Sequence, residues 1–207
     1  MVRPSVAKLG TNFRSYVDEP HLLSKEKGFP DLFGNKNPVS IEIGMGKGLF
    51  MHDIATDHPH RNFLGIEKVK KFLLLSASRM DKSNLNNVKL FSVDAKEFIE
   101  KEIPESSVNE FFILFPDPWP KRRHRRRRMV QKDFLLLLKS KLVSKGVIHI
   151  TTDHKSYFQW IEEVTASLMN TDFCEIPSQR GPYITNFQRK YEAEGRPIYY
   201  KSLQSLP

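Results

Sequence analysis

Residues 111–128 read FFILFPDPWPKRRHRRRR, and this stretch decides the fold. The apolar run at residues 111–115 is typical of a fully buried strand, because no polar residue alternates with its side chains. Pro116 and Pro118 end the strand, since proline donates no ladder hydrogen bond and restricts the residue before it. Asp117 is therefore expected at a stiff corner beyond the carboxyl end of a strand, where open α/β sheets bind ligands. A simple Pro-Asp-Pro turn is the alternative interpretation.

A block of positive charge follows this corner directly. Residues 121–128 hold one lysine, six arginines and His124 but no acidic residue, and they contribute +7 of the formal net charge of +9. Arginine can bind phosphate through two parallel hydrogen bonds, so the block predicts a nucleic-acid or polyanion site. A localisation signal or a solvated loop is the alternative. The position beside a candidate active-site corner favours nucleic acid.

The composition indicates one well-buried domain with an anionic partner. The 207 residues are 39% hydrophobic and 28% charged, and the isoelectric point is about 9.6. Cys174 is the single cysteine of the sequence, which argues against a disulfide framework and a zinc cluster, and no metal is expected. No segment approaches the length of a membrane span and no signal-peptide pattern opens the sequence, so we expect a cytoplasmic protein.

A strand, a glycine-rich turn and a helix are predicted earlier in the chain. Residues 39–43 form a short apolar strand that includes Glu42, and residues 49–57 are predicted to be helical. The turn between them contains three glycines: Gly44, Gly46 and Gly48. Such a turn lets the backbone approach a nucleotide-like ligand closely. Its spacing differs from G-x-G-x-x-G because the third glycine comes one residue early, so the turn alone is a weak signal.

Acidic residues follow three further predicted strands. The strands at residues 62–66, 88–93 and 147–152 are followed by Glu67, Asp94 and Asp153. Glu67 lies about as far downstream as an acid that binds ribose hydroxyls, although it could instead be a helix-start acid. Asp94 precedes Ala95 and a short helix, so it could simply be an N-cap. Because strand ends meet at one sheet edge, Glu42, Glu67 and Asp94 predict a single cofactor pocket.

The remaining pattern completes an α/β fold. Helices are predicted over residues 68–79, 131–143 and 154–169, with Gly146 as the stop of the second, and a last strand over residues 197–203. Alternating strands and helices predict a mostly parallel sheet with helices on both faces.

The apolar residues of segment 1–37 do not recur with the period of a helix or of a strand over any sustained length. We interpret this segment as a partly flexible N-terminal extension of a domain that covers residues 38–207. Four apolar side chains of this extension are candidates for packing on the domain: Phe13, Tyr16, Leu22 and Leu23.

These motifs together resemble those of the bacterial tRNA (guanine-N7-)-methyltransferases, a branch of the class I S-adenosylmethionine-dependent methyltransferases. The resemblance spans most of the chain and rests on residues 42–48, 65–67, 94–95, 115–121 with the basic extension, 151–153 and 185–199. The glycine motif is generic to methyltransferases, whereas F-P-D-P-W followed by lysine and arginines is highly specific.

The resemblance implies a Rossmann-like, seven-stranded, mostly parallel sheet with one antiparallel strand at its end. It also implies that the chain methylates guanine 46 in the tRNA variable loop, giving 7-methylguanosine, with S-adenosylmethionine as cofactor. The implied cofactor residues are Glu42, Gly44, Gly46, Gly48, Glu67 at the ribose, Asp94 near the adenine, Ala95 and Asp117, which is also the implied catalytic residue. The implied substrate contacts are Lys121, Asp153, Thr185, Asn186, Phe187 and Gln188. The implied RNA-binding residues are Arg123, His124, Arg125, Arg126, Arg127 and Arg128. A monomer and a homodimer are both compatible with the sequence.

One residue departs from the family pattern. Relatives commonly end the late motif in glutamate, T-x-[FY]-E, whereas this chain has Gln188. The glutamine carbonyl can still accept a hydrogen bond from guanine, although less strongly than a carboxylate. Glu192 lies four residues on and could compensate from the same helical face.

Two other classes of protein remain open at this point. A nucleotide-binding oxidoreductase would use the turn at residues 44–48, but the early third glycine and the polycation argue against it. A non-enzymatic RNA-binding protein with a vestigial pocket would have no use for strand-end acids, so binding of S-adenosylmethionine distinguishes it.

Overall fold

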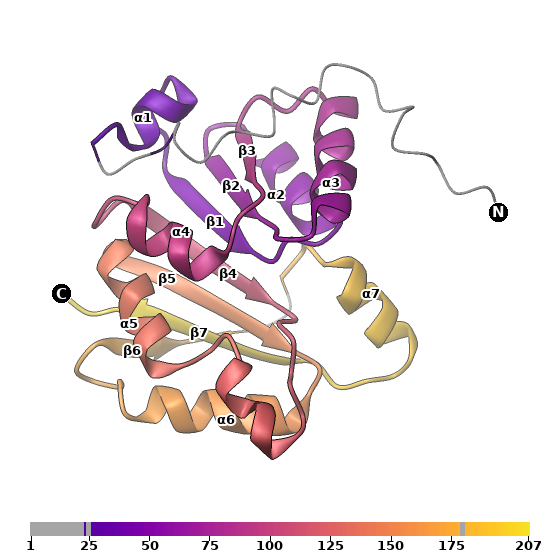
Figure 1. The fold of residues 1–207 in the computed structure, drawn as a ribbon, viewed down its shortest axis with the longest axis vertical. Coiled ribbons are helices and arrows are strands. Elements are labelled where there is room, and N and C mark those ends of the chain that lie inside the picture. The colour runs from indigo at the N-terminus through magenta and orange to yellow at the C-terminus, as the bar shows by residue number, and fades with distance from the viewer. Residues whose placement is uncertain (1–22, 24–25, 179–180) are drawn as a thin grey trace.

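The computed structural model describes residue 23, residues 26–178 and residues 181–207. Its centre is a seven-stranded sheet with the strand order β3-β2-β1-β4-β5-β7-β6 (Figure 1). The strands are β1 (Val39–Ile43), β2 (Asn62–Ile66), β3 (Val88–Phe91), β4 (Val108–Leu114), β5 (Leu142–Thr152), β6 (Phe173–Ile176) and β7 (Tyr199–Ser205). The helices are α1 (Gly28–Phe33), α2 (Leu49–Asp57), α3 (Lys70–Lys82), α4 (Ala95–Lys101), the 3₁₀ helix η4 (Arg122–Arg127), α5 (Lys132–Lys141), α6 (Lys155–Ala166) and α7 (Asn186–Ala193).

Strands β1 to β5 run parallel to one another, and β7 runs antiparallel to both β5 and β6. The expected α/β class and the seven-stranded sheet are therefore confirmed. The antiparallel strand β7 lies between β5 and β6, one place from the edge. The sequence pattern did not locate β6, which has only four residues and includes the polar residue Glu175.

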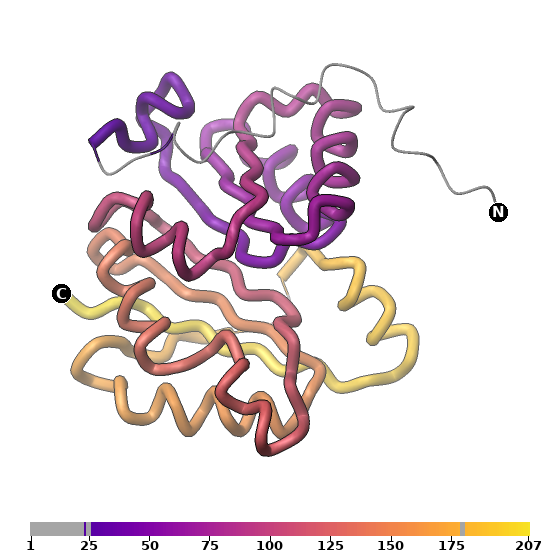
Figure 2. Tube along the Cα trace, viewed as in Figure 1, coloured from indigo at the N-terminus to yellow at the C-terminus, as the bar shows by residue number. Residues whose placement is uncertain are grey.

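Two apolar cores lie on opposite faces of the sheet, because successive side chains of a strand point to opposite sides. In β4, Phe111 and Ile113 belong to one core, while Phe112 belongs to the other. Side chains of α4, α5 and α6 fill the first core, and side chains of α2 and α3 fill the second. Helices thus cover both faces, as the pattern predicted. The backbone trace in Figure 2 shows α7 apart from these layers, beside the end of β4.

Several predicted boundaries differ from the structure by two or three residues at one end or both, and the largest error lies where α5 meets β5. The helix predicted over residues 131–143 ends at Lys141, and β5 begins at the next residue. Gly146 does not stop a helix, because it lies buried inside β5, where a Cβ atom would come within 2.8 Å of Leu142 Cδ2. Leu142 and Val143 continue the apolar pattern of the helix, so periodicity alone could not separate the two elements.

The N-terminal region packs on the domain where the structure describes it. Leu23 is fully buried, and Phe29 of α1 is 4% exposed in the same core. Phe13, Tyr16 and Leu22 lie outside the described residues, and the division at residue 37 stays a prediction. Across the described ranges, no helix has the length and apolar character that a membrane crossing requires.

Candidate functional site

The carboxyl ends of the parallel strands bring the predicted acids to one edge of the sheet. Ile43 at the end of β1 pairs with Ile66 at the end of β2, and Ile66 pairs with Phe91 at the end of β3. On the other side, Leu114 at the end of β4 pairs with Thr151 of β5. The turns and loops that follow these strands therefore share one rim.

The glycine turn has a backbone that ordinary side chains would disfavour. Gly44, Gly46 and Gly48 all have positive φ angles, between 57° and 75°. At Gly48 an added Cβ would also lie 2.7 Å from the Ser76 hydroxyl, which donates a hydrogen bond of 3.0 Å to the Gly46 carbonyl. Ser76 of α3 thus fixes the shape of the turn, and no sequence signal had indicated it.

Glu67 supports the same turn from the end of β2. Its Oε2 accepts a 2.9 Å hydrogen bond from the Gly46 N–H, and its Oε1 accepts a 2.7 Å bond from the Val69 N–H. Glu67 as a whole is only 8% exposed. Glu67 therefore combines the two interpretations made from sequence: it binds the backbone at the start of a helix, and it stands beside the glycine turn.

Glu42 is the most perturbed acid of the site. Its side chain is 2% exposed and its Oε2 has no hydrogen-bond partner. Burial, and in second place the charge of Glu67, raise the pKa of Glu42 to about 8. A buried acceptor without a partner is costly, so Glu42 is suited to a ligand that donates hydrogen bonds or carries positive charge.

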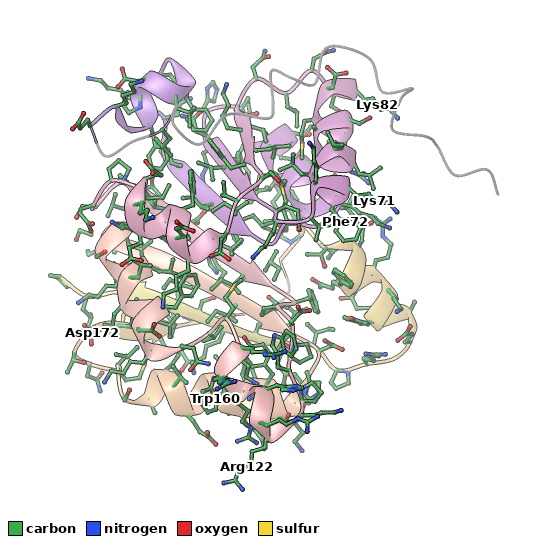
Figure 3. The ribbon with its side chains drawn as sticks, in the orientation of Figure 1. Lys71, Phe72, Lys82, Arg122, Trp160 and Asp172 are labelled. Carbon is green, nitrogen blue, oxygen red and sulfur yellow. The ribbon has the colours of Figure 1, made fainter. Side chains whose placement is uncertain are left out.

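A pocket of about 180 Å³ brings the glycine turn and the late sequence motif together. Its walls include Glu42, Gly44, Gly46, Leu114 and Phe72, and the start of α7 closes it with Thr185, Asn186 and Phe187. Figure 3 shows Phe72 near the end of α3 that faces α7. Thr185 caps α7, because its side chain accepts the Gln188 N–H at 2.9 Å.

Five predicted cofactor residues are not among the walls of this pocket: Gly48, Glu67, Asp94, Ala95 and Asp117. Gly48 and Glu67 belong to the glycine turn or support it, whereas Asp94 and Ala95 lie at the start of α4. Asp94 is the N-cap of α4, with a 3.4 Å bond from the Glu97 N–H, and it pairs with Lys68 at 3.3 Å. Ala95 is the first residue of that helix. The N-cap interpretation of Asp94 is confirmed. Its side chain remains half exposed at the same sheet edge, so a ligand contact stays a prediction.

The corner after β4 holds a strained backbone around Asp117. Phe115 and Trp119 have φ angles of 53° and 41°, which large side chains rarely adopt. Three contacts hold this corner in place. The Phe115 ring packs against Tyr191 of α7, Trp119 packs against Arg127, and the Pro118 carbonyl accepts a 2.9 Å hydrogen bond from Arg128 Nε. Asp117 itself is exposed to solvent.

The basic block divides into an exposed part and a buried residue. Most of the block is exposed or half-exposed. These residues are Lys121, which precedes η4, and five members of η4: Arg123, His124, Arg125, Arg126 and Arg127. Figure 3 shows Arg122 extending from the rim of the molecule. Arg128 is only 2% exposed, and its guanidinium lies over the rings of Tyr157 and Trp160. The structure therefore argues against the RNA contact expected for Arg128 and makes it a support of the corner.

The other predicted substrate residues already have partners. Asp153 accepts a 2.9 Å hydrogen bond from Arg196, which also packs over the Tyr191 ring. Gln188 is 5% exposed and lines a second, adjoining pocket of about 310 Å³. Sequence reasoning missed Tyr191, whose ring contacts Phe115, Phe187 and two cations. Among the described residues, no group of three or more metal-binding side chains is placed to hold a metal ion.

The chain is similar to methyltransferases over most of its length. A family model described as "Putative methyltransferase" matches residues 36–200. A protein of Geobacillus sp. (strain WCH70) named tRNA (guanine-N(7)-)-methyltransferase is 33% identical over 180 residues, which cover 82% of this chain and 79% of that protein. A protein of the same name from Bacillus licheniformis is 32% identical over 203 residues, 92% of this chain and 91% of that protein.

Solved structures share the fold at low sequence identity. An antibiotic-related methyltransferase superposes with a TM-score of 0.62 at 22% identity, covering 88% of this chain and 94% of that one. The 16S rRNA methyltransferase KamB superposes with a TM-score of 0.64 at 15% identity, covering 86% of this chain and 93% of that one. At such identities these likenesses show the Rossmann-like methyltransferase fold alone.

Proposed function

Since the chain belongs to the tRNA (guanine-N(7)-)-methyltransferase family, we propose that it transfers a methyl group from S-adenosylmethionine to N7 of guanine 46 in tRNA. The observation that carries this proposal is one sheet edge with two features. A pocket there holds a buried, unpartnered carboxyl and a glycine turn, and a solvent-exposed carboxylate and a polycation follow the adjacent strand. The proposed site of action is the cytoplasm, where tRNA is abundant.

The pocket fits the cofactor by its chemistry. When bound, S-adenosylmethionine supplies a methyl group on a positively charged sulfur. The unpartnered Oε2 of Glu42 is suited to an ammonium group, and the glycine backbone allows a ligand to approach without a Cβ in the way. Glu67 keeps acceptor capacity beyond its two backbone hydrogen bonds and would take ribose hydroxyls. Asp94 would take donors of the adenine, with Ala95 beside it.

Asp117 is the proposed catalytic residue. N7 of guanine has an exposed lone pair, so no proton must be removed before attack, and the protein contributes mainly by alignment. Positive charge develops on the purine ring as the new bond forms. A fixed carboxylate beside the ring stabilises this charge and holds the base by its N–H donors. The strained backbone at Phe115 and Trp119 would fix the carboxylate in that place.

The exposed cations beside Asp117 form the proposed RNA interface. They are Lys121, Arg123, His124, Arg125, Arg126 and Arg127. These side chains would bind phosphates by charge and shape, with little sequence information, while the target guanine leaves its stack to reach the pocket. Asp153, Thr185, Asn186, Phe187 and Gln188 would contact the nucleoside.

Incubation with unmodified tRNA and methyl-labelled S-adenosylmethionine, followed by nucleoside analysis, tests the function. The expected product is 7-methylguanosine. Label in another nucleoside would keep the fold and cofactor but overturn the guanine site. Absence of label in a protein that binds the cofactor would overturn the proposed substrate.

The role of Asp117 is tested by Asp117→Asn, which keeps shape and removes charge. We expect turnover to fall about 100-fold to 1000-fold, in line with the loss of one charge-stabilising group. Affinity for tRNA should stay within about threefold, because the exposed cations supply the proposed phosphate contacts and the asparagine carbonyl can still accept hydrogen bonds from the base. Near-normal turnover of the variant would remove Asp117 from the mechanism.

A further inference from the structure

Gln188 is held by two neighbours in a defined orientation. Its Nε2 donates hydrogen bonds to Glu192 Oε1 at 2.9 Å and to the Tyr200 hydroxyl at 3.1 Å. Glu192 lies one turn further along α7, and Tyr200 comes from β7. An ionised carboxylate can only accept hydrogen bonds, so Glu192 requires the NH₂ side of the amide to face it. The two N–H bonds are then both in use.

This arrangement leaves the carbonyl oxygen as the group that Gln188 can offer to a ligand. We propose that Glu192 is a positioning residue that fixes the Gln188 amide with its carbonyl available to the substrate base. The proposal rests on the function proposed above. Guanine presents N–H donors at N1 and N2, which a carbonyl accepts, whereas adenine presents an acceptor at N1. An amide turned the other way would offer N–H donors and would reject guanine.

The surroundings of Gln188 place it where such a contact is possible. Gln188 and Tyr200 line the pocket of about 310 Å³, together with Leu114 at the end of β4 and Thr151 of β5. Leu114 and Phe50 line both this pocket and the smaller pocket beside the glycine turn. The two pockets therefore adjoin at the sheet edge that also leads to Asp117. A base in the larger pocket would lie next to the proposed cofactor site.

The pair also explains why the departure at position 188 is tolerated. A glutamate there would set two carboxylates within hydrogen-bond distance, one at a buried and one at a half-buried position, and one of them would have to bind a proton or move away. The chain instead has an amide at position 188 and a carboxylate at position 192. Exchanging both residues would restore an amide–carboxylate pair with the charge moved toward the base. Positions 188 and 192 thus form one unit.

Binding measurements with the full chain test this inference separately from the reaction. The affinity is measured for two tRNA transcripts, one with guanine and one with inosine at position 46, in the presence of S-adenosylhomocysteine. Inosine lacks the N2 amino group, so a fixed acceptor should favour guanine by about tenfold. Glu192→Gln removes the fixed orientation, because an amide can either donate or accept, and should reduce the preference to below about threefold. Glu162→Gln, an exposed residue on α6, is the matched control.

A second set of variants guards against a purely structural effect. Gln188→Glu alone should weaken guanine binding most near neutral pH, where two carboxylates compete, and the exchange of Gln188→Glu with Glu192→Gln should recover it at least fivefold. Melting temperatures and cofactor binding of Glu192→Gln, of Glu162→Gln and of the exchange should match the wild type.

The outcomes separate this inference from the proposed function. An unchanged guanine preference in Glu192→Gln, or an exchange no better than Gln188→Glu alone, would overturn the role of Glu192. If the wild type makes no 7-methylguanosine but its guanine preference depends on Glu192, the proposed reaction fails and the positioning role stands. If the wild type makes 7-methylguanosine and shows no guanine preference in binding, the reaction stands and the positioning role fails.

Discussion

Burial raises the pKa of the Glu42 carboxyl, an effect that its position in the sequence does not reveal. Glu42 is almost fully buried, and its pKa rises from 4.5 to about 8. In the native protein without cofactor, this group keeps its proton through neutral pH, whereas in the unfolded chain it releases the proton near pH 4.5. The native state therefore binds more protons between these values, and its stability falls as pH rises through that window.

We expect Glu42→Gln to remove this dependence. Relative to the variant, the wild type should lose free energy of unfolding between pH 4.5 and pH 8, by up to about 4 kcal/mol. Denaturant unfolding of the cofactor-free protein at four pH values measures the difference. Glu100→Gln, an exposed residue of α4, should keep the wild-type profile. Parallel profiles for the wild type and Glu42→Gln would show that Glu42 ionises normally in the folded protein.

At the residue scale, sequence predicted which side chains gather at the sheet edge but not what each one contacts. Glu67 was placed correctly beside the turn, and its hydrogen bond to Gly46 needed coordinates. Arg127 and Arg128 are adjacent and chemically identical, yet one is exposed and the other is buried beneath aromatic rings. Their difference depends on Tyr157 and Trp160, which are about 30 residues away along the chain. Local sequence carries no record of such distant contacts.

The element that positions the proposed cofactor site is the turn between β1 and α2. Gly48 and Gly34 have similar φ angles, 66° and 69°, so alanine at either position meets a similar backbone cost of about 1 kcal/mol. Only at Gly48 would the new Cβ collide with Ser76 of α3, and nothing lies within 4 Å of it at Gly34. Gly48→Ala should therefore lower stability by about 1–3 kcal/mol more than Gly34→Ala.

The same two variants distinguish the cost of the backbone conformation from the cost of the contact with Ser76. Gly48→Ala should also weaken S-adenosylmethionine binding, because Ser76 can no longer hold the Gly46 carbonyl in place, whereas Gly34→Ala should leave cofactor affinity unchanged. Thermal unfolding and cofactor titration measure both effects. Equal losses of stability in the two variants would show that Ser76 moves aside without lowering the free energy of unfolding.

At the element scale, sequence predicted the elements with strong apolar runs. It did not predict a four-residue strand with a polar position, or the point where a helix passes into a strand without a turn. β1 and β2 match their predicted bounds, and α2 does as well. β6 has four residues and a polar position, so its pattern is too weak to detect. The junction of α5 and β5 has no turn residue between helix and strand. Pairing of Leu142 with Val108 of β4, rather than local propensity, fixes where β5 begins.

At the scale of the whole molecule, charge is separated from the apolar layers. The sheet and its two helix layers supply the core, while the exposed or half-exposed cations of residues 121–127 lie on the segment that follows β4. Sequence anticipated this separation, because an unbroken apolar run predicts a strand between helix layers and an unbroken basic run predicts a surface. It could not anticipate α7 standing beside the strand ends with Phe187 half exposed, since that placement depends on the packing of Tyr191 against Phe115.

The charged surface predicts how tRNA binding responds to salt. If about five phosphates are neutralised, the slope of log affinity against log salt should be roughly −3.5 to −4.5. Replacing Arg123 and Arg126 together by alanine removes two exposed cations, so the slope should become less steep by about 1.4 to 1.8. The melting temperature should change little, because neither side chain is buried.

Arg128→Ala should behave in the opposite way. It removes a guanidinium that packs over Tyr157 and Trp160 and donates to the Pro118 carbonyl, so we expect the melting temperature to fall by about 5–10 °C. The salt slope should stay within about 0.5 of the wild type, since a buried cation releases no counterions when RNA binds. Filter binding between 50 and about 200 mM salt and thermal unfolding distinguish the two variants. If Arg128→Ala flattened the slope as much as the double replacement, Arg128 would have to leave its aromatic site on binding, and the corner that holds Asp117 would rearrange with it.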